Sequence, residues 1–129
     1  MTANRFNFRA YILKEKYLVD VEILHPEYIL AYDGKTYSFN NINNSKNYIL
    51  MQSTGLVDKN GKEVFEKDII KFDGKYTKAK RLIRYSEKEG RLVACYTDFV
   101  YDYCDFNKDW ISQWEVIGNI YENPELLKS

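Results

Sequence analysis

Hydrophobic and polar residues alternate in short runs along this chain of 129 residues. In residues 6–13 every second position is apolar, at Phe6, Phe8, Ala10 and Ile12. After a polar tripeptide the same holds in residues 17–24, at Tyr17, Val19, Val21 and Ile23. A period of two predicts half-buried strands, and the short polar link predicts that these two strands pair as a hairpin. His25 and Pro26 end the second strand, because proline lacks an N–H donor and disfavours a helical conformation in the residue before it.

Turn signals separate further short strands. Asp33 and Gly34 lie between runs at 28–32 and 35–39, and an Asp-Gly pair tolerates the positive φ of a two-residue hairpin turn. Further strands are predicted at 48–52, 68–72, 81–85, 91–96, 99–103 and 114–121, with turns at 58–61, 73–74 and 87–90 and a loop after residue 103. A helical turn at 123–127 closes the chain. This pattern predicts a mainly β fold of small antiparallel strands with little helix.

An asparagine-rich segment divides the chain. Residues 40–47 contain too little apolar surface to order independently, so we interpret them as a surface loop. We therefore expect two subdomains, an N-terminal β-hairpin subdomain at 1–47 and a C-terminal subdomain at 48–129, or one compact unit formed from both.

Composition excludes several classes of function. Nineteen basic residues balance nineteen acidic ones, so no overall field attracts a polyanion. His25 is the only histidine, which excludes any mechanism that needs two. Cys95 and Cys104 lack a CxxC spacing, so we expect thiols rather than a zinc site or a disulfide. With no signal-like or membrane-spanning apolar run, we expect a cytoplasmic protein with no membrane association.

Charge is nevertheless segregated locally. The basic residues of the segment 71–84, called here the basic hairpin, are Lys71, Lys75, Lys78, Lys80, Arg81 and Arg84. The acidic residues of the segment 98–109, called the acidic segment, are Asp98, Asp102, Asp105 and Asp109. The basic hairpin has three interpretations: a solvated edge that prevents unwanted strand pairing, a surface for a protein partner or self-assembly, or a surface for nucleic acid.

No residue pattern predicts catalysis. The acidic segment lacks the glycine and the distal glutamate of a calcium loop, so we interpret it as a solvated or partner-facing edge rather than a metal site. Cys104 stands beside Asp105, whose charge disfavours a thiolate. The hydroxyls of Ser53 and Thr54 have no base nearby in the sequence, and with Gly55 they are interpreted as a structural turn. We expect no catalytic residues, no cofactor, no metal and no small-molecule substrate.

Three segments resemble the YopX-like proteins of bacteriophages and prophages. They are residues 8–11, the block 50–72 and the block 115–127, which follow one another in the family's order. The resemblance implies a β-rich fold with an SH3-like barrel in the C-terminal half and expression in a bacterial cytoplasm. It implies no catalytic residues, and the role of the family is undefined.

One position departs from the family's pattern. Family sequences have glycine where this chain has Lys67, between Glu66 and Asp68. A lysine with positive φ costs roughly 1 kcal/mol or more, so we predict a negative φ at Lys67. The leading hypothesis is a non-enzymatic phage-encoded protein that binds protein partners or its own copies. The alternative is a nucleic-acid-binding accessory protein that uses the basic hairpin, residues 71–84.

Overall fold

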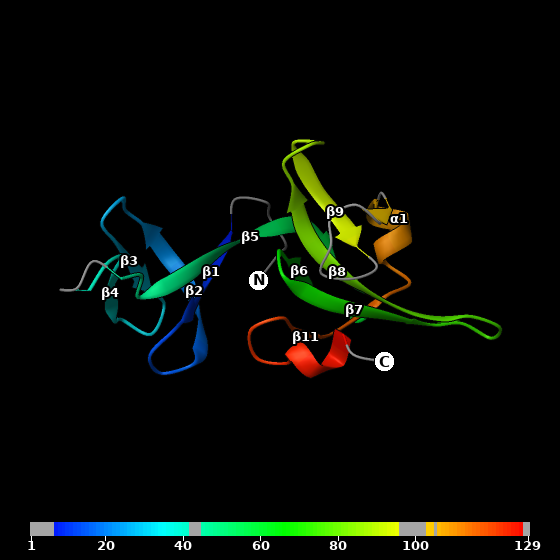
Figure 1. Ribbon diagram of the computed structural model, residues 1–129, viewed down its shortest axis with the longest axis horizontal. Coiled ribbons are helices and arrows are strands. Elements are labelled where there is room, and N and C mark those ends of the chain that lie inside the picture. Colours follow the sequence, from blue (N-terminus) through cyan, green and yellow to red (C-terminus); the bar gives the residue numbers. More distant parts are fainter. Residues whose placement is uncertain (1–6, 42–44, 96–102, 105, 128–129) are drawn as a thin grey trace.

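The fold is built from two antiparallel sheets (Figure 1). The computed structural model describes residues 7–41, 45–95, 103–104 and 106–127. The first sheet contains β1 (Phe8–Ile12), β2 (Tyr17–Leu24), β3 (Tyr28–Ala31), β4 (Thr36–Ser38), β5 (Tyr48–Val57) and β6 (Glu63–Phe65). The second contains β7 (Asp68–Asp73), β8 (Lys78–Ser86), β9 (Arg91–Cys95), β10 (Tyr103–Cys104) and β11 (Glu115–Asn119). The prediction of a mainly β protein is confirmed.

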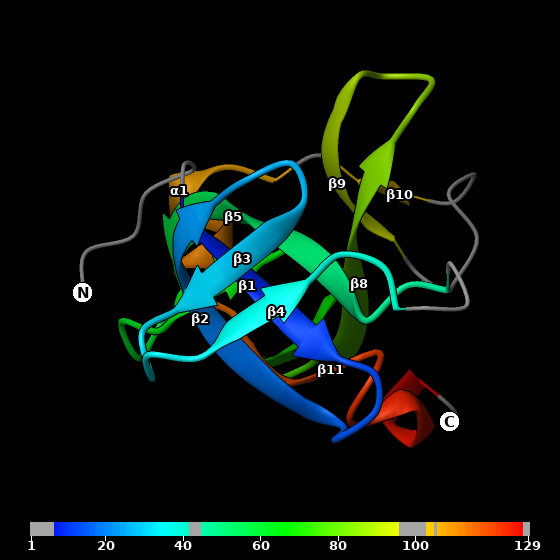
Figure 2. The same cartoon turned by 90° about the vertical axis from the view of Figure 1, so that its left-hand side faces the viewer.

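The first sheet has the strand order β4-β3-β2-β1-β5-β6. The predicted hairpins form: β1 pairs with β2, and β3 with β4 around a turn in which Gly34 has φ 86°. The apolar side chains that alternate along these strands make one core, which consists of Ala10, Ile12, Val19, Ile29, Ala31 and Tyr48. Figure 2 views the molecule from the end at which β3 and β4 lie, and these two strands lie in front of β1 and β2.

The second sheet has the strand order β10-β9-β8-β7-β11 and surrounds a core of its own. The buried residues of this core are Val64, Ile70, Ile83, Ala94, Ile111, Trp114 and Val116. Because Val64 belongs to β6, the first sheet also contributes to the second core. This arrangement is consistent with the SH3-like barrel that the resemblance implies.

Strand β5 connects the two parts of the molecule. Its residues 48–52 pair with β1, while Ser53 and Val57 pair with β6. Between these last two residues the register shifts, with Gly55 at φ 79°. The interpretation of Ser53, Thr54 and Gly55 as a turn was therefore wrong: they form an irregularity inside a strand. The Thr54 hydroxyl donates to the Val64 carbonyl at 2.7 Å, which keeps β6 attached there.

Two short helices follow. The helix α1 (Lys108–Ile111) lies where a loop was predicted, and its cap is Asn107, whose side-chain oxygen accepts from the Trp110 N–H at 2.9 Å. The prediction of a loop was therefore wrong here, because four residues are too few to show a helical period in the sequence. The 3-10 helix η1 (Pro124–Leu127) lies at the predicted closing turn. Neither helix in the described part of the chain is long and apolar enough to cross a membrane. The strand predicted at 99–103 falls mostly outside the described residues.

The backbone at Lys67 corrects the sequence prediction, since its φ is +74° rather than negative. Its N–H donates to the Ile83 carbonyl at 2.7 Å, and its own carbonyl accepts from the Ile120 N–H at 3.0 Å. The first bond ties the β6–β7 turn to β8, and the second ties it to the residue that follows β11. Together they hold the lysine in the left-handed region, which costs roughly 1–2 kcal/mol for a residue with a Cβ.

Candidate binding surface

The basic hairpin projects from the body of the molecule (Figure 1). Its neighbours pair only with its base: β11 reaches Lys71, opposite Glu115, and β9 reaches Leu82, opposite Cys95. Beyond these points β7 and β8 pair with each other as far as Asp73 opposite Lys78. Residues 73–78 are called here the hairpin tip.

Local packing explains how the tip is formed. The Gly74 N–H donates to the Thr77 carbonyl at 2.8 Å and closes the turn. A Cβ at Gly74 would lie 2.5 Å from the ring of Phe72, so only glycine fits without a shift. Phe72 itself packs against Trp114, with the ring centres 5.6 Å apart. The tip is therefore anchored in the second core through Phe72.

The tip presents an aromatic side chain to solvent. Tyr76 is 88% exposed, the largest fraction among the large hydrophobic side chains of the described residues. The Lys75 ammonium lies 5.3 Å from the centre of its ring. Lys78, also exposed, stands opposite Asp73 in the ladder. An exposed ring flanked by cations can stack on a base, cover an apolar patch or enter a pocket.

The other predicted cations have local partners at the base of the hairpin. Lys71 pairs with Asp73 at 3.2 Å and with Glu115 at 3.9 Å. The Lys80 ammonium donates to the Leu126 carbonyl of η1 at 3.0 Å. The guanidinium of Arg81 lies 5.7 Å from the ring centre of Trp114.

The six cations therefore do not form one uniform surface. Side chains on a strand alternate between its faces, so Lys78, Lys80 and Arg84 share one face of β8, while Arg81 faces the other way with Ile83. Arg84 is half-buried. The prediction of these residues as a binding set stays a prediction, and the structure separates an exposed tip from a base engaged in packing.

The acidic segment is described only in part. Asp98, Asp102 and Asp105 lie outside the described residues. Asp109 is exposed on α1, where its backbone carbonyl accepts from the Ser112 hydroxyl at 2.7 Å. Within the described ranges, no group of three His, Cys, Asp or Glu side chains could hold a metal ion. Complementarity between the acidic segment and the basic hairpin stays a prediction.

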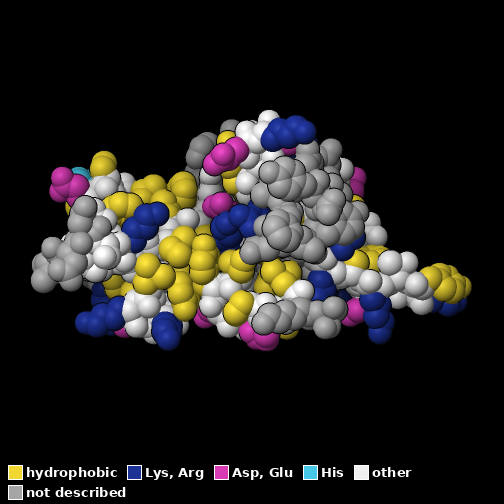
Figure 3. Space-filling model, in the orientation of Figure 1, with side chains coloured by type: hydrophobic (Ala, Val, Ile, Leu, Met, Phe, Trp, Pro, Cys, Tyr) yellow, Lys and Arg dark blue, Asp and Glu magenta, His cyan; other side chains and the backbone are white. Residues whose placement is uncertain are grey.

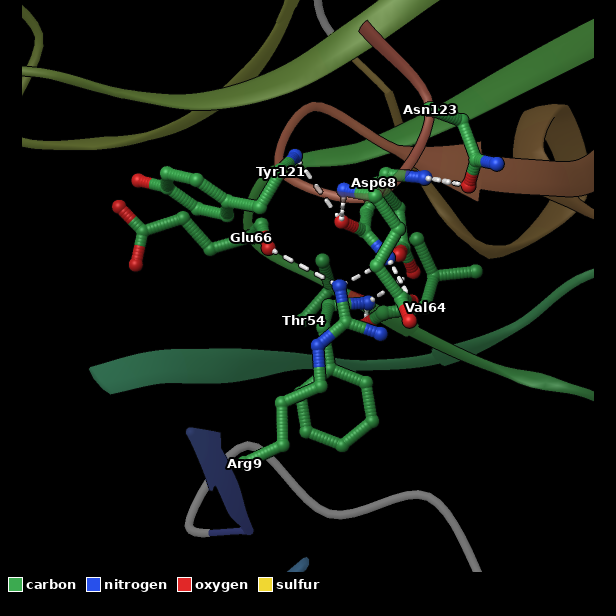
Figure 4. Close-up of polar contacts among 10 residues, drawn as sticks. Arg9, Thr54, Val64, Glu66, Asp68, Tyr121 and Asn123 are labelled. Carbon is green, nitrogen blue, oxygen red and sulfur yellow. Dashed lines mark hydrogen bonds and ion pairs between the residues drawn. The ribbon is translucent and has the colours of Figure 1, made fainter. Parts of the chain in front are cut away.

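Sequence reasoning missed a buried ion pair between the two sheets (Figure 4). A guanidinium nitrogen of Arg9 lies 2.6 Å from Asp68 Oδ1, and the guanidinium stacks 4.6 Å from the ring centre of Phe65. The same nitrogen donates to the Glu66 carbonyl, and Asp68 Oδ2 accepts from the Phe65 N–H at 2.8 Å. The only sequence signal was that both ends of the pair fall in blocks of the family resemblance.

This pair lies in the interior of the protein. The side chains of Arg9 and Asp68 are 8% and 1% exposed, so both are largely removed from solvent. Burial raises the pKa of Asp68 above its ordinary value, although Arg9 and the Phe65 N–H act in the opposite direction. The pair joins β1 to the start of β7.

Two further buried polar side chains, those of Asp58 and Asn119, bind the backbone of turns. The Asp58 carboxylate accepts from the backbone N–H groups of Asn60, Lys62 and Val116, all at 2.9 Å, and ties the 58–61 turn to β11. Asn119 Oδ1 accepts from the N–H groups of residues 121 and 122. Asp58 and Asn119 each lie in one of the blocks of the resemblance.

An apolar groove lies at the opposite end of the molecule from the hairpin tip. It measures about 400 Å³. Its lining consists of Leu24, His25, Pro26, Phe39, Tyr48 and Leu50. His25 follows the end of β2, as predicted: its Nδ1 accepts from the Glu27 N–H at 3.0 Å, and its ring stacks on Tyr28. Sequence reasoning missed this groove because its residues come from β2, β5 and two loops.

Fold and site together define a class: a mainly β protein of two sheets, joined by a buried ion pair and carrying a projecting hairpin. The family model of the YopX protein matches residues 7–128. The chain therefore belongs to the YopX family, as the resemblance predicted.

Two solved structures have this fold. Protein EF1440 from Enterococcus faecalis is 32% identical, with a TM-score of 0.67, over 95% of this chain and 97% of that one. Protein yopX from Bacillus subtilis is 19% identical, with a TM-score of 0.60, over 98% of each chain. At that lower identity the likeness shows the fold alone. A search of curated proteins found no match.

Proposed function

We propose that this member of the YopX family is a non-enzymatic binding protein of phage or prophage origin. It acts in the bacterial cytoplasm and contacts a protein partner, or further copies of itself, through the basic hairpin. The observation that carries the proposal is Tyr76, 88% exposed at the tip of a projecting hairpin.

The distribution of polar groups supports a non-enzymatic role. Arg9 and Asp68 are buried against each other. Asp58 and Asn119 are 3% exposed, and their side chains hold the backbone of turns. In the described part of the chain, the buried carboxylates of Asp58 and Asp68 and the buried amide of Asn119 therefore bind other parts of the fold, which supports a non-enzymatic role.

The second candidate function is nucleic-acid binding. It is favoured by Lys78, Lys80 and Arg84 on one face of β8, with Tyr76 placed to stack on a base. The engagement of Lys80 with the Leu126 carbonyl weighs against it, because phosphate contact would compete with that bond.

Site-specific crosslinking tests the leading proposal. A photoreactive amino acid replaces Tyr76 in one variant and Lys88, in the exposed β8–β9 turn, in a matched control. Both are irradiated in the bacterial cells that produce them. We expect a protein adduct from position 76 and none from position 88. No protein adduct at 76, or equal adducts at both positions, would contradict the proposal.

A salt titration tests the nucleic-acid alternative. Fluorescence anisotropy with single- and double-stranded DNA and RNA compares the wild type with the double variant Lys75→Glu, Lys78→Glu. Neutralisation of several phosphates makes affinity fall steeply with salt. Under the leading proposal we expect no binding at low salt. Binding that is salt-dependent and lost in the double variant would establish the alternative instead.

A further inference from the structure

We propose that the partner of the hairpin tip is a second copy of the chain, with Tyr76 of one copy inserted into the apolar groove of the next. This inference rests on the proposed function, since it takes the hairpin as the contact element. It adds the receptor, which is the groove lined by Leu24, His25, Pro26, Phe39, Tyr48 and Leu50.

The groove suits an aromatic side chain in size and lining. At about 400 Å³ it falls within the usual range of ligand pockets, about 300–1,000 Å³. Tyr48 is 3% exposed and belongs to the first core, while Leu24 and Phe39 are 47% and 38% exposed. Phe39 and Tyr48 already meet edge to face at 5.7 Å, an arrangement to which another ring can be added.

The charges beside the groove complement those of the tip. Glu27 is exposed and lies against the lining: its carbonyl accepts from the Phe39 N–H at 2.9 Å, and its own N–H donates to His25. Lys75 and Lys78 flank Tyr76 on the incoming tip. Opposite charges brought together by insertion favour the correct register and disfavour other partners.

The groove side also carries a positive charge, and the tip also carries a negative one. Lys46 is exposed and forms an isolated bridge with Asn40, next to Phe39, so this side of the groove carries a cation. Asp73 gives the tip one carboxylate, opposite Lys78 in the ladder. Each surface thus presents at least one charge of either sign.

The two surfaces lie at opposite ends of the long axis. Figure 1 places the hairpin at one end and β3 and β4 at the other, and Figure 3 shows hydrophobic side chains at both ends. A contact between different surfaces of identical chains is head to tail, so it extends as an open chain or closes into a ring. The tip of one copy therefore cannot enter the groove of the same copy.

Sedimentation velocity with three variants tests the proposal. Tyr76→Ala removes the ring from the tip, Leu24→Lys places a charge at the groove, and Tyr85→Ala is the control, because Tyr85 is a half-exposed tyrosine of β8 away from the tip. The wild type and Tyr85→Ala should exceed the 15.4 kDa of one chain as concentration rises. Tyr76→Ala and Leu24→Lys should associate at least about tenfold more weakly.

Mixing the two impaired variants gives the decisive result. Tyr76→Ala retains an intact groove and Leu24→Lys an intact tip, so one productive contact forms between them. At concentrations at which each variant alone is monomeric, we expect a one-to-one complex in the mixture and nothing larger. Circular dichroism and urea unfolding confirm that both variants are folded. A wild type that stays monomeric, or a mixture that stays monomeric while the wild type associates, overturns the proposal.

This result is separable from that of the proposed function. Crosslinking at position 76 to a different protein, together with a monomeric wild type, ends the present inference and leaves the proposed function in place. Absence of any protein adduct at position 76 ends both.

Discussion

The ion pair between Arg9 and Asp68 holds the N-terminal strand β1 against the start of β7, with 2.6 Å between guanidinium nitrogen and carboxylate oxygen. Asp68 also accepts the Phe65 N–H, and the Arg9 guanidinium covers the Phe65 ring. This buried, hydrogen-bonded charge pair is thus one contact between the sheets, beside the packing of Val64 in the second core. Removal of one member leaves the other charged and buried, which costs far more than loss of an exposed pair.

Substitution within this pair should be strongly destabilising. We expect Asp68→Ala to lower the free energy of unfolding by about 3–5 kcal/mol, because it leaves Arg9 without its carboxylate. The double variant Arg9→Met, Asp68→Leu should lose much less than the sum of the two single changes. Urea unfolding followed by circular dichroism gives these values.

An exposed pair provides the control. Lys59 and Glu115 lie 4.0 Å apart with side chains 43% and 30% exposed. Lys59→Ala should cost no more than about 1 kcal/mol. Equal losses for Asp68→Ala and Lys59→Ala would show that the buried pair does not hold the sheets together.

The pH dependence of stability should report the burial of Asp68. Because burial raises its folded-state pKa above the ordinary 3.8, the folded protein binds the proton more tightly than the unfolded chain. The contribution of this group to stability is therefore complete below about pH 3.8 and is lost as the pH rises through the folded-state pKa.

Comparison with a variant that cannot titrate isolates this effect. Urea unfolding of the wild type and of Asp68→Asn from pH 3.5 to 7 should show the wild type losing stability relative to the variant as pH rises. A difference that changes in favour of the wild type with rising pH would mean that Arg9, rather than burial, dominates the pKa of Asp68.

The strands could be predicted from the sequence because their cause is local. The alternation in residues 17–24 and the Asp33-Gly34 turn specify a strand and a hairpin without reference to the rest of the chain. The basic hairpin was located correctly for the same reason, since Gly74 marks its turn.

Features caused by distant contacts could not be predicted. Lys67 has a positive φ because Ile83 and Ile120 bond to its backbone, and neither partner is near in sequence. The pairing of Arg9 with Asp68 spans 59 positions. The groove likewise combines two strands and two loops, so no single segment carries its signature.

Replacement of Lys67 by glycine should stabilise the protein. Glycine adopts positive φ without the steric cost of a Cβ, although it also gives the unfolded chain more freedom. We expect Lys67→Gly to raise the free energy of unfolding by about 0.5–1 kcal/mol. Lys16, with φ 61°, should respond in the same direction.

A lysine outside the left-handed region serves as the control. Lys59 is not among the residues with positive φ, so Lys59→Gly should be neutral or destabilising. The test is urea unfolding at one pH for all three variants. Destabilisation by Lys67→Gly, or stabilisation by Lys59→Gly of equal size, would contradict the assignment of strain to position 67.

The final prediction concerns the fit between Gly118 and Asn123 at the end of β11. A Cβ at Gly118 would clash with Asn123 Oδ1 and would lie 2.9 Å from a methyl group of Leu126. Gly118→Ala should therefore displace η1 and cost about 1–3 kcal/mol through overpacking. Asn123→Ala removes the acceptor of the Asn119 N–H and should cost about 1 kcal/mol.

The double variant distinguishes steric conflict from general damage. With the Asn123 side chain shortened, the new methyl group of Gly118→Ala gains space, so the double variant should be more stable than the sum of the single losses predicts. Because the Lys80 ammonium bonds to the Leu126 carbonyl, the displacement should also reach the base of the basic hairpin. Amide hydrogen exchange at β7 and β8 would detect it. Strict additivity, with unchanged exchange there, would show that Gly118 serves neither close approach nor the support of the hairpin.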